Sequence, residues 1–521
     1  ELGENGVNSE VYFGDDYEEI RYGQREGGDV YKGRFEGESF KVNTLERGRT
    51  YYWRIDQIDG TGRIHRGDVW NFTTELPEGT FAVEANDEEI DIYEWCESEI
   101  LIDGLDFENP YDADEVKVDA EIEVPGGGKL VVPCFYYTGE GNDSLWKMRF
   151  TPREVGDYRY EIVVTKGSDE WKRSEAIELE VGEGVVKREG FLSVNPDSMY
   201  SFVFDSGERY RGCGINFGWE NIEFGKVYTD EWMLDWLAEH GCNFVCTSSM
   251  PWHCAIEWKK YGAGRYDPDE SERLDEIVEM AADRGIYIKL SLNYYWELST
   301  IPDTFGNKQW DNNPYNVIQG GPCREPGEFF TMDEAKGLYK DKLRYLTARW
   351  GYSPYILAWE LWKEVDNVSR KEETVTEEMV VEWHKEMGEY LDEVDPYGHM
   401  VTTSRDDFGG ELWGSEYMDF SQTHPYGPTR HYESKIKGYV ERYDKPHVLG
   451  EAGYSWQGPR LHVRGKDYER AYHMGLWRGM FLPTPILPIN WWWQWFDDRG
   501  ELYHMGPAAK FMKEMVKSDC L

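Results

Sequence analysis

The 521-residue chain has few cysteines, and their spacing is irregular. Eight cysteines in a chain of this length do not make the dense disulfide framework of small secreted domains. Cys96 and Cys134 fall in one predicted β domain, so a single disulfide between them is an open alternative. Cys242, Cys246 and Cys254 lack the C-x₂-C spacing of a zinc site, and we expect them to be buried free thiols.

Basic residues are also scarce, since 56 Lys and Arg face 101 Asp and Glu and the formal net charge is −45. A field of this sign repels phosphate backbones and anionic membrane surfaces, so we expect neither nucleic acid nor a membrane as a partner. Long apolar runs are missing too. The most apolar stretch, 480–495, contains three prolines and is shorter than a membrane-spanning helix.

Aromatic residues are abundant, at 16% of the chain with 23 Trp and 36 Tyr. This exceeds what a hydrophobic core needs and favours surfaces that stack on flat, weakly polar ligands, of which sugars are the first candidates. The chain begins at Glu1 and not at a methionine, from which we expect a processed or truncated product.

The length and the patterning predict three domains. Residues 1–78 and 79–185 read as short alternating strands separated by Gly-rich turns, which is typical of all-β sandwiches. Residues 75–79 form the expected linker between them. From residue 186 the pattern changes to eight strand–helix units, which favours a (β/α)₈ barrel over 186–521. The expected barrel strands are 211–217, 243–248, 287–293, 356–361, 400–403, 420–423, 447–450 and 486–491.

The chemistry of such a barrel lies where its strands end. The fourth strand runs into Trp359-Glu-Leu-Trp-Lys-Glu364, and the seventh runs into Leu449-Gly-Glu451. Each therefore carries a carboxylate, Glu364 or Glu451, to the same mouth. A pair of carboxyl groups across one centre is what cleavage of a glycosidic bond requires, because one protonates the leaving oxygen and the other meets the developing oxocarbenium ion. With so many acids in the chain, two ordinary exposed side chains are the alternative.

Several motifs carry a family resemblance. The run 359–364 resembles the Trp-x-x-x-Asn-Glu run of clan A glycoside hydrolases, the group that includes family 5 cellulases and mannanases, and Gly450-Glu-Ala-Gly453 resembles their nucleophile run. The resemblance implies Glu364 as acid/base and Glu451 as nucleophile, with retention of configuration and no cofactor. It further implies that His424 and Tyr426 orient the nucleophile and the sugar, and that Trp493, or else Trp495, stacks on the sugar.

The two preceding domains carry weaker resemblances. Leu45-Glu-Arg-Gly-Arg-Thr-Tyr-Tyr-Trp-Arg-Ile-Asp56 resembles a fibronectin type III module with clipped opening strands. Phe150–Tyr158 resembles an immunoglobulin-like sandwich of the uncharacterised kind that often precedes polysaccharide-degrading barrels.

Two positions depart from the family pattern. Lys363 stands where the family has an Asn that grips a sugar hydroxyl; it either points elsewhere, meets a sulfate or carboxylate of the substrate, or marks an impaired enzyme. Asn293 and Asn216 are candidates to supply the missing amide. Cys246 stands where many members have an Arg near the nucleophile, with Arg324 as a speculative substitute.

Aromatic residues follow the predicted strands closely enough to form a rim around the mouth. The candidates are Trp219, Trp252, Tyr294, Tyr295, Trp296 and Trp456, although a single Trp is more often part of the core.

Three hypotheses follow. The first is a secreted or cell-surface retaining hydrolase of a neutral β-linked polysaccharide, an endo-β-1,4-glucanase or a mannanase. The second is a hydrolase of a charged or sulfated marine polysaccharide, motivated by Lys363 and Arg324 but opposed by the net charge. The third is a catalytically impaired carbohydrate-binding protein.

Overall fold

The structure is a computed structural model, and it describes residues 6–23, 30–35, 40–42, 45, 49–61, 63–74, 80–140, 143–303, 306–406, 411–457 and 465–518. The predicted linker 75–79 lies outside these residues. The chain divides into two compact units, the first formed by residues 1–84, 99–107 and 137–146 and the second by the remainder.

An antiparallel sheet makes up most of the first unit. Its strands follow the order β2-β1-β3-β4, and β5 also pairs with β3. The strands are β1 (Gly6–Gly14), β2 (Tyr31–Phe35), β3 (Thr50–Asp59), β4 (Ile64–His65) and β5 (Val69–Thr73), with the short helix α1 (Tyr17–Tyr22) after β1. The buried Arg54 on β3 donates to the Asp56 carboxylate and to the Arg21 carbonyl oxygen, so its charge is compensated.

Residues 81–182 are also formed from strands, and four of the strands, β6, β8, β11 and β12, contribute residues to both units. One sheet has the order β10-β9-β13-β15-β7, with β14 on β13, and the other has the order β11-β12-β8-β6. The strands are β6 (Phe81–Ala85), β7 (Glu89–Asp91), β8 (Cys96–Asp103), β9 (Val116–Glu123), β10 (Lys129–Pro133), β11 (Phe135–Glu140), β12 (Asp143–Phe150), β13 (Gly156–Lys166), β14 (Asp169–Arg173) and β15 (Ile177–Gly182). Cys96 and Cys134 are buried free thiols, so the alternative of a disulfide between them is not realised.

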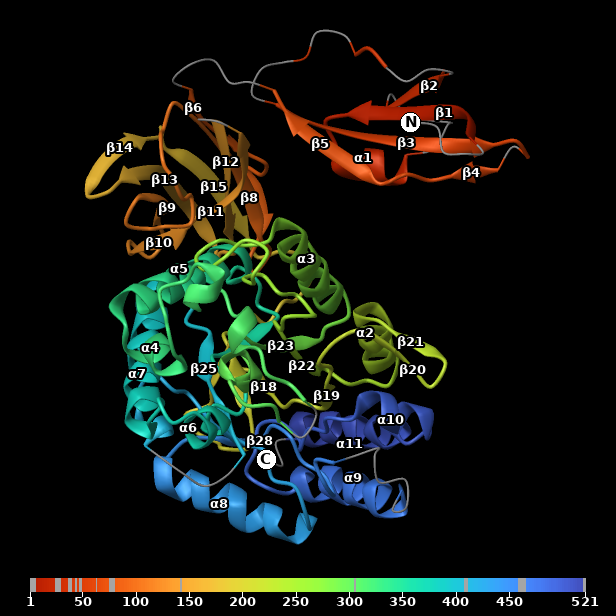
Figure 1. Cartoon of the computed structure of the whole chain (residues 1–521), viewed down its shortest axis with the longest axis vertical. Coiled ribbons are helices and arrows are strands. Elements are labelled where there is room, and N and C mark those ends of the chain that lie inside the picture. Colours follow the sequence, from red (N-terminus) through yellow and green to blue (C-terminus); the bar gives the residue numbers. More distant parts are fainter. Residues whose placement is uncertain are drawn as a thin grey trace. The chain divides into compact units, whose positions relative to one another are not determined.

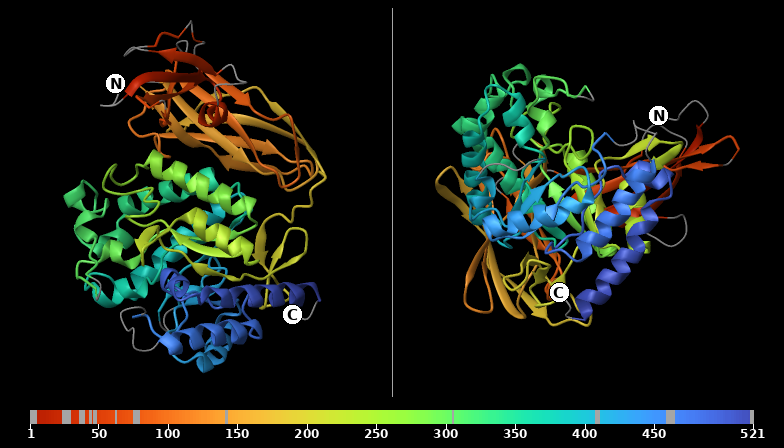
Figure 2. Two further views of the ribbon diagram at one scale, coloured as in Figure 1. Left: turned by 90° about the vertical axis from the view of Figure 1, so that its right-hand side faces the viewer. Right: turned by 90° about the horizontal axis from the view of Figure 1, so that it is seen from below.

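Strands and helices alternate in the rest of the second unit (Figure 1). The parallel strands are β19 (Gly214–Asn216), β22 (Phe244–Ser248), β23 (Tyr287–Ser291), β24 (Ile356–Glu360), β25 (Met400–Thr402), β26 (Ser404–Arg405), β27 (Ser421–Thr423) and β28 (His447–Leu449). The longer helices are α2 (Asp230–Glu239), α3 (Pro268–Asp283), α5 (Asp333–Trp350), α7 (Glu377–Val394), α8 (Tyr432–Tyr443), α9 (Gly465–Met480) and α11 (Met505–Lys517). The views of Figure 2 show α9 and α11, which are in contact, side by side.

Hydrogen bonds connect these strands around a closed circuit. The five-stranded sheet β19-β22-β23-β24-β25 is followed by β26-β27-β28, and the Ser404 N–H donates to the Trp362 carbonyl oxygen between them. The eighth segment is extended chain, joined to β28 by the bond from the Ile489 N–H to the Leu449 carbonyl oxygen. Gly212 and Ile486 form a parallel bridge, which brings the circuit back to the segment before β19.

Local sequence signals account for where the helices begin. Thr229 and Thr376 accept hydrogen bonds from backbone N–H groups of the first turns of α2 and α7, as N-cap residues do. Helix α3 begins with Asp267 as N-cap and Pro268 in its first turn.

Several elements were not expected, including the following three. The hairpin β20 (Asn221–Glu223) with β21 (Lys226–Tyr228) follows the first strand, helix α6 (Asp366–Lys371) follows the fourth, and helix α10 (Trp493–Asp498) follows the eighth segment. The last two matter for the site, because α6 contributes residues to it and α10 changes the direction of the tryptophans that end the eighth segment.

Candidate active site

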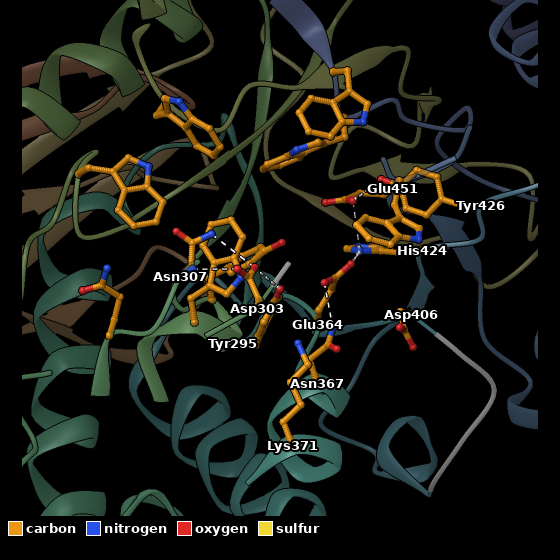
Figure 3. A pocket seen from close by; sticks show the side chains of 18 residues that line it. Tyr295, Asp303, Asn307, Glu364, Asn367, Lys371, Asp406, His424, Tyr426 and Glu451 are labelled. Atoms are coloured by element: carbon orange, nitrogen blue, oxygen red, sulfur yellow. Dashed lines mark hydrogen bonds and ion pairs between the residues drawn. The ribbon is translucent and has the colours of Figure 1, made fainter. Parts of the chain in front are cut away.

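A cavity of about 880 Å³ opens at the carboxyl ends of the parallel strands (Figure 3). This volume is at the upper end of the range of ligand-binding pockets. Nine aromatic side chains line it: Trp219, Trp252, Tyr294, Tyr295, Trp296, Tyr426, Trp456, Trp491 and Trp492. Glu364 and Glu451 lie in the same cavity, so an aromatic wall surrounds two carboxyl groups.

Glu364 follows β24 and has an unusual backbone conformation. Its φ angle is 56°, in the left-handed region that residues other than glycine seldom adopt. The Glu364 N–H donates to Ser404 Oγ at 3.1 Å, and Asn367 Nδ2 donates to the carboxylate oxygen Oε2 at 3.0 Å. His424 Nδ1 lies 2.8 Å from the other oxygen, Oε1. Three contacts thus fix a strained residue and aim its carboxyl group into the cavity.

Glu451 follows β28 on the other side of the cavity. Tyr426 donates its hydroxyl hydrogen to Glu451 Oε2 at 2.7 Å. Gly450 precedes it, and a Cβ at that position would come within 2.6 Å of the Gln422 side chain, so only glycine fits the backbone that carries Glu451. Glu451 is 3% exposed, in contrast to the ordinary exposed acid that was the alternative interpretation.

The two carboxyl groups lie close to each other and to His424. One oxygen of each and one His424 nitrogen all lie within 4.8 Å of one another. The separation agrees with the roughly 5–5.5 Å of retaining glycosidases and is well short of the roughly 6.5–9.5 Å of inverting ones. The same three side chains have a spacing that a metal ion can use, and a metal there would occupy the oxygens that hydrolysis needs.

The environment raises the pKa of both carboxyl groups. Burial and the nearby Asp406 carboxylate raise the pKa of Glu364 to about 7, against the opposing effect of Lys363, Lys371 and Arg370. Burial and the Glu364 carboxylate raise the pKa of Glu451, and His424, Lys363 and the Tyr426 hydroxyl oppose that rise. Burial lowers the pKa of His424 to about 4, so this imidazole is neutral near pH 7. With a pKa of about 7, Glu364 can hold a proton near neutral pH.

Most residues that the sequence nominated for this site line the cavity. They are Glu364, Glu451, His424, Tyr426, Trp219 and Trp252, together with the predicted rim residues Tyr294, Tyr295, Trp296 and Trp456. Six others do not line it: Lys363, Asn216, Asn293, Trp493, Trp495 and Arg324.

The tryptophan expected to stack on the sugar is displaced by two residues. Trp493 is fully buried, and Trp495 packs on Tyr468 and Arg499 at the far side of α10. Trp491 and Trp492 line the cavity instead. The reason is that helix α10 begins at Trp493, so the extended chain that points side chains into the cavity ends earlier than the apolar pattern indicates. Gly218 allows this packing, since a Cβ there would lie 2.9 Å from the Trp491 ring.

The two polar candidates have structural partners. Asn293 is buried, where it donates to Glu297 Oε2 at 2.7 Å and accepts from the Tyr339 hydroxyl at 2.6 Å. It therefore holds the loop after β23. Lys363 is fully buried and does not line the cavity, and its Nζ lies 3.8 Å from Glu451 Oε1.

Several residues of the cavity were not expected from the sequence. They are Asp303, Asn307, Gln309, Asn367, Lys371, Asp406, Trp491 and Trp492. A signal existed for two of them. Asn367 and Lys371 stand three and seven residues after Glu364, the spacing that places side chains on one face of a helix, and α6 begins at Asp366. Asp303, Asn307 and Gln309 come from a long loop without a periodic pattern.

One family model matches the chain, and it covers the second predicted β domain. Residues 91–165 match the model described as a domain of unknown function (DUF5060). Among the described residues, none of the helices combines the length and the apolar composition that crossing a membrane requires.

The curated relatives bear one kind of name. Mannan endo-1,4-beta-mannosidase A of Podospora anserina is 27% identical over 257 residues, which cover 44% of this chain and 61% of that protein. Mannan endo-1,4-beta-mannosidase 3 of Oryza sativa subsp. japonica is 29% identical over 160 residues, covering 28% of this chain and 31% of that protein. The chain spans about a third of the length of most such relatives and less than two thirds of the Podospora protein.

Solved structures that match the chain include glycoside hydrolases. A candidate glycoside hydrolase from Bacteroides vulgatus ATCC 8482 matches with a TM-score of 0.51 and 19% identity, over 71% of this chain and 66% of that one. The endo-beta-1,4-mannanase from Thermotoga petrophila matches with a TM-score of 0.44 and 18% identity, over 59% of this chain and 77% of that one. At these identities the first likeness concerns the fold. The comparisons agree with the expectation of a glycoside hydrolase.

Proposed function

We propose that the chain is a retaining hydrolase of a neutral β-1,4-linked polysaccharide, with mannan as its main substrate. The observation that carries the proposal is the pair of Glu364 and Glu451, whose oxygens lie within 4.8 Å in a cavity lined with aromatic rings. The names of the relatives favour mannan over cellulose. The catalytic domain is a (β/α)₈ barrel over 186–521, which the closed circuit of strands supports. The preceding domains are a fibronectin type III-like module (1–78) and an immunoglobulin-like sandwich (79–185).

The proposed reaction has two steps. Glu364 gives its proton to the leaving glycosidic oxygen while Glu451 attacks the anomeric carbon, the bond to the leaving sugar breaks, and a glycosyl ester forms on Glu451. Glu364, now a carboxylate, takes a proton from water, whose oxygen attacks the same carbon and releases Glu451. The Glu364 pKa of about 7 supplies the protonated acid that the first step needs. No step needs a cofactor.

The positions of Lys363 and Arg324 do not favour the alternative of a charged polysaccharide as substrate. Neither Lys363, which is buried, nor Arg324 lines the cavity. Among the described lining residues, Lys371 is the one Lys or Arg, and it lies over the Tyr295 ring in a cavity that also contains Asp303 and Asp406. A polyanion would therefore meet more negative than positive charge.

The test is turnover on a panel of polysaccharides by the purified chain. Reducing ends released from β-1,4-mannan, glucomannan, β-1,4-glucan and a sulfated galactan would be measured, with Glu451→Ala as the control. We expect the highest kcat/KM on mannan, product of retained configuration in NMR spectra taken within the first minutes, and no change on adding EDTA. Turnover of none of the four, with retained affinity for mannan, would favour the carbohydrate-binding hypothesis. First-formed product of inverted configuration would contradict the nucleophile role of Glu451.

A further inference from the structure

Lys363 lies directly before Glu364, and its side chain lies beneath the cavity. None of it is exposed to solvent. Its Nζ donates to Asn216 Oδ1 at 3.0 Å and lies 3.7 Å from Cys246 Sγ. The Trp491 ring, whose centroid is 4.6 Å from Nζ, covers it. An ammonium group in such a place is costly to desolvate unless anions compensate its charge.

The nearest anion is the proposed nucleophile. Lys363 Nζ lies 3.8 Å from Glu451 Oε1. That oxygen is buried and has no hydrogen-bond partner among the described residues, whereas Oε2 accepts from Tyr426. The ammonium therefore faces the one carboxylate oxygen of Glu451 that hydrogen bonds leave unsatisfied.

A second buried ion pair lies below the first. Lys289 Nζ lies 2.8 Å from Glu360 Oε2, and neither side chain is exposed. Although burial opposes it, Lys289 and then Lys363 lower the pKa of Glu360 to about 2. Ser291 and Gln422 also donate to this carboxylate. With Glu364 protonated and His424 neutral, the two ammonium groups are matched by the Glu360 and Glu451 carboxylates, so these four groups together carry no net charge.

We propose that Lys363 is a positioning residue whose ammonium group keeps Glu451 ionised while Glu364 is protonated; this inference rests on the proposed function. Two carboxyl groups so close together do not readily ionise at once, and a fixed cation decides which of them does. In the first step Glu364 loses its proton to the leaving oxygen as Glu451 becomes a neutral ester. The same ammonium then balances Glu364, so the number of buried charges stays constant.

The proposal explains the two departures from the family pattern together. Cys246 offers no positive charge from strand β22, where many members have an Arg. Strand β24 is separated from β22 by β23 alone, and Lys363, which follows β24, places its ammonium group 3.7 Å from Cys246 Sγ. Lys363 thus supplies the positive charge that Cys246 does not provide.

The first experiment compares pH–rate profiles of Lys363→Met and the native chain on mannan. Without the ammonium the pKa of Glu451 rises, so we expect the acid limb of kcat/KM to move up by about one to two pH units. KM at the pH optimum is expected to stay within about twofold, since Lys363 does not line the cavity. Lys363→Arg, which keeps a cation, should move the limb less.

Lys342→Met is the matched control. Lys342 is also buried and lies 3.4 Å from Glu257, but it does not line the cavity or contact either proposed catalytic carboxylate. Its loss should lower stability without moving the acid limb. An equal limb shift in Lys342→Met, or a raised KM with an unmoved limb in Lys363→Met, would overturn the proposal.

The second experiment needs no activity and so separates this inference from the proposed function. Thermal midpoints of Lys363→Met, Glu451→Gln and the double variant are compared at pH 7. Each single change leaves a buried charge unmatched. The sum of the decreases in thermal midpoint of the two single variants should therefore exceed the decrease in the double variant by about 2 °C or more. If Lys363→Met does not fold, adding Glu451→Gln should restore folding. Additive losses, or no restoration, would refute the ion pair.

Discussion

Glu364, which is partly buried, and Glu451, which is buried, both follow parallel strands, yet the charged and polar groups around them differ. Glu364 has the Asp406 carboxylate among its neighbours and accepts a neutral amide hydrogen bond from Asn367. Glu451 has the Lys363 ammonium and the Tyr426 hydroxyl within reach. The contrast shows that burial alone does not decide which carboxyl group acts as acid and which as nucleophile. The charged and polar groups next to each carboxyl group decide it.

Removing Glu451 should have the largest effect. Glu451→Ala takes away the group that forms the covalent intermediate, so we expect kcat on mannan to fall by about 10⁴-fold or more. Reducing-end release measures this loss. Glutamine at the same position should be equally inactive, because an amide keeps the shape but is a poor nucleophile. Activity above a tenth of the native value in either variant would remove Glu451 from its role.

Replacing Glu364 should show which half of the reaction depends on it. Glu364→Gln cannot protonate a leaving group, so hydrolysis of mannan should fall by about 10²–10⁴-fold. An aryl mannoside with an acidic phenol as leaving group needs no such proton and should retain its first step, visible as a burst of phenol in stopped-flow absorbance. Equal losses on both substrates would contradict the assignment.

The same variant has a consequence for stability. Burial raises the pKa of Glu364 from 4.5 to about 7, so the folded state binds a proton that the unfolded state has lost between these two pH values. Stability from this group is thus full below about pH 4.5 and declines as the pH rises to about 7, by about 3 kcal/mol. Glu364→Gln removes this decline, which denaturant unfolding at pH 5 and pH 8 would measure.

Neutralising Asp406 should have the smallest effect and should sharpen the comparison. The Asp406 carboxylate raises the pKa of Glu364, so Asp406→Asn should lower it and move the alkaline limb of kcat/KM to lower pH by about half a unit to one unit. The activity at the optimum should change by only a few fold. Asp311→Asn, at an exposed residue that does not line the cavity, is the control. A shift to higher pH would contradict the assigned cause.

The strand ends and the carboxylate pair could be predicted because they depend on local signals. Apolar runs such as Ile356–Glu360 identify a buried strand, and the residues that follow it must emerge at its carboxyl end. The register of the last segment could not be predicted, because Trp491, Trp492 and Trp493 are alike in sequence and only the start of α10 separates them. The direction of Lys363 depends on Asn216, Cys246 and Trp491, which come from three other parts of the chain.

The left-handed backbone of Glu364 affects which substitutions selection for thermal stability would favour in this chain. An L-residue at φ 56° makes the folded state less stable than it would be with glycine there. A screen that selects only for heat resistance would therefore reward Gly at position 364, which lacks a carboxyl group. At position 364, the residue that favours thermal stability and the residue that catalysis needs are therefore different.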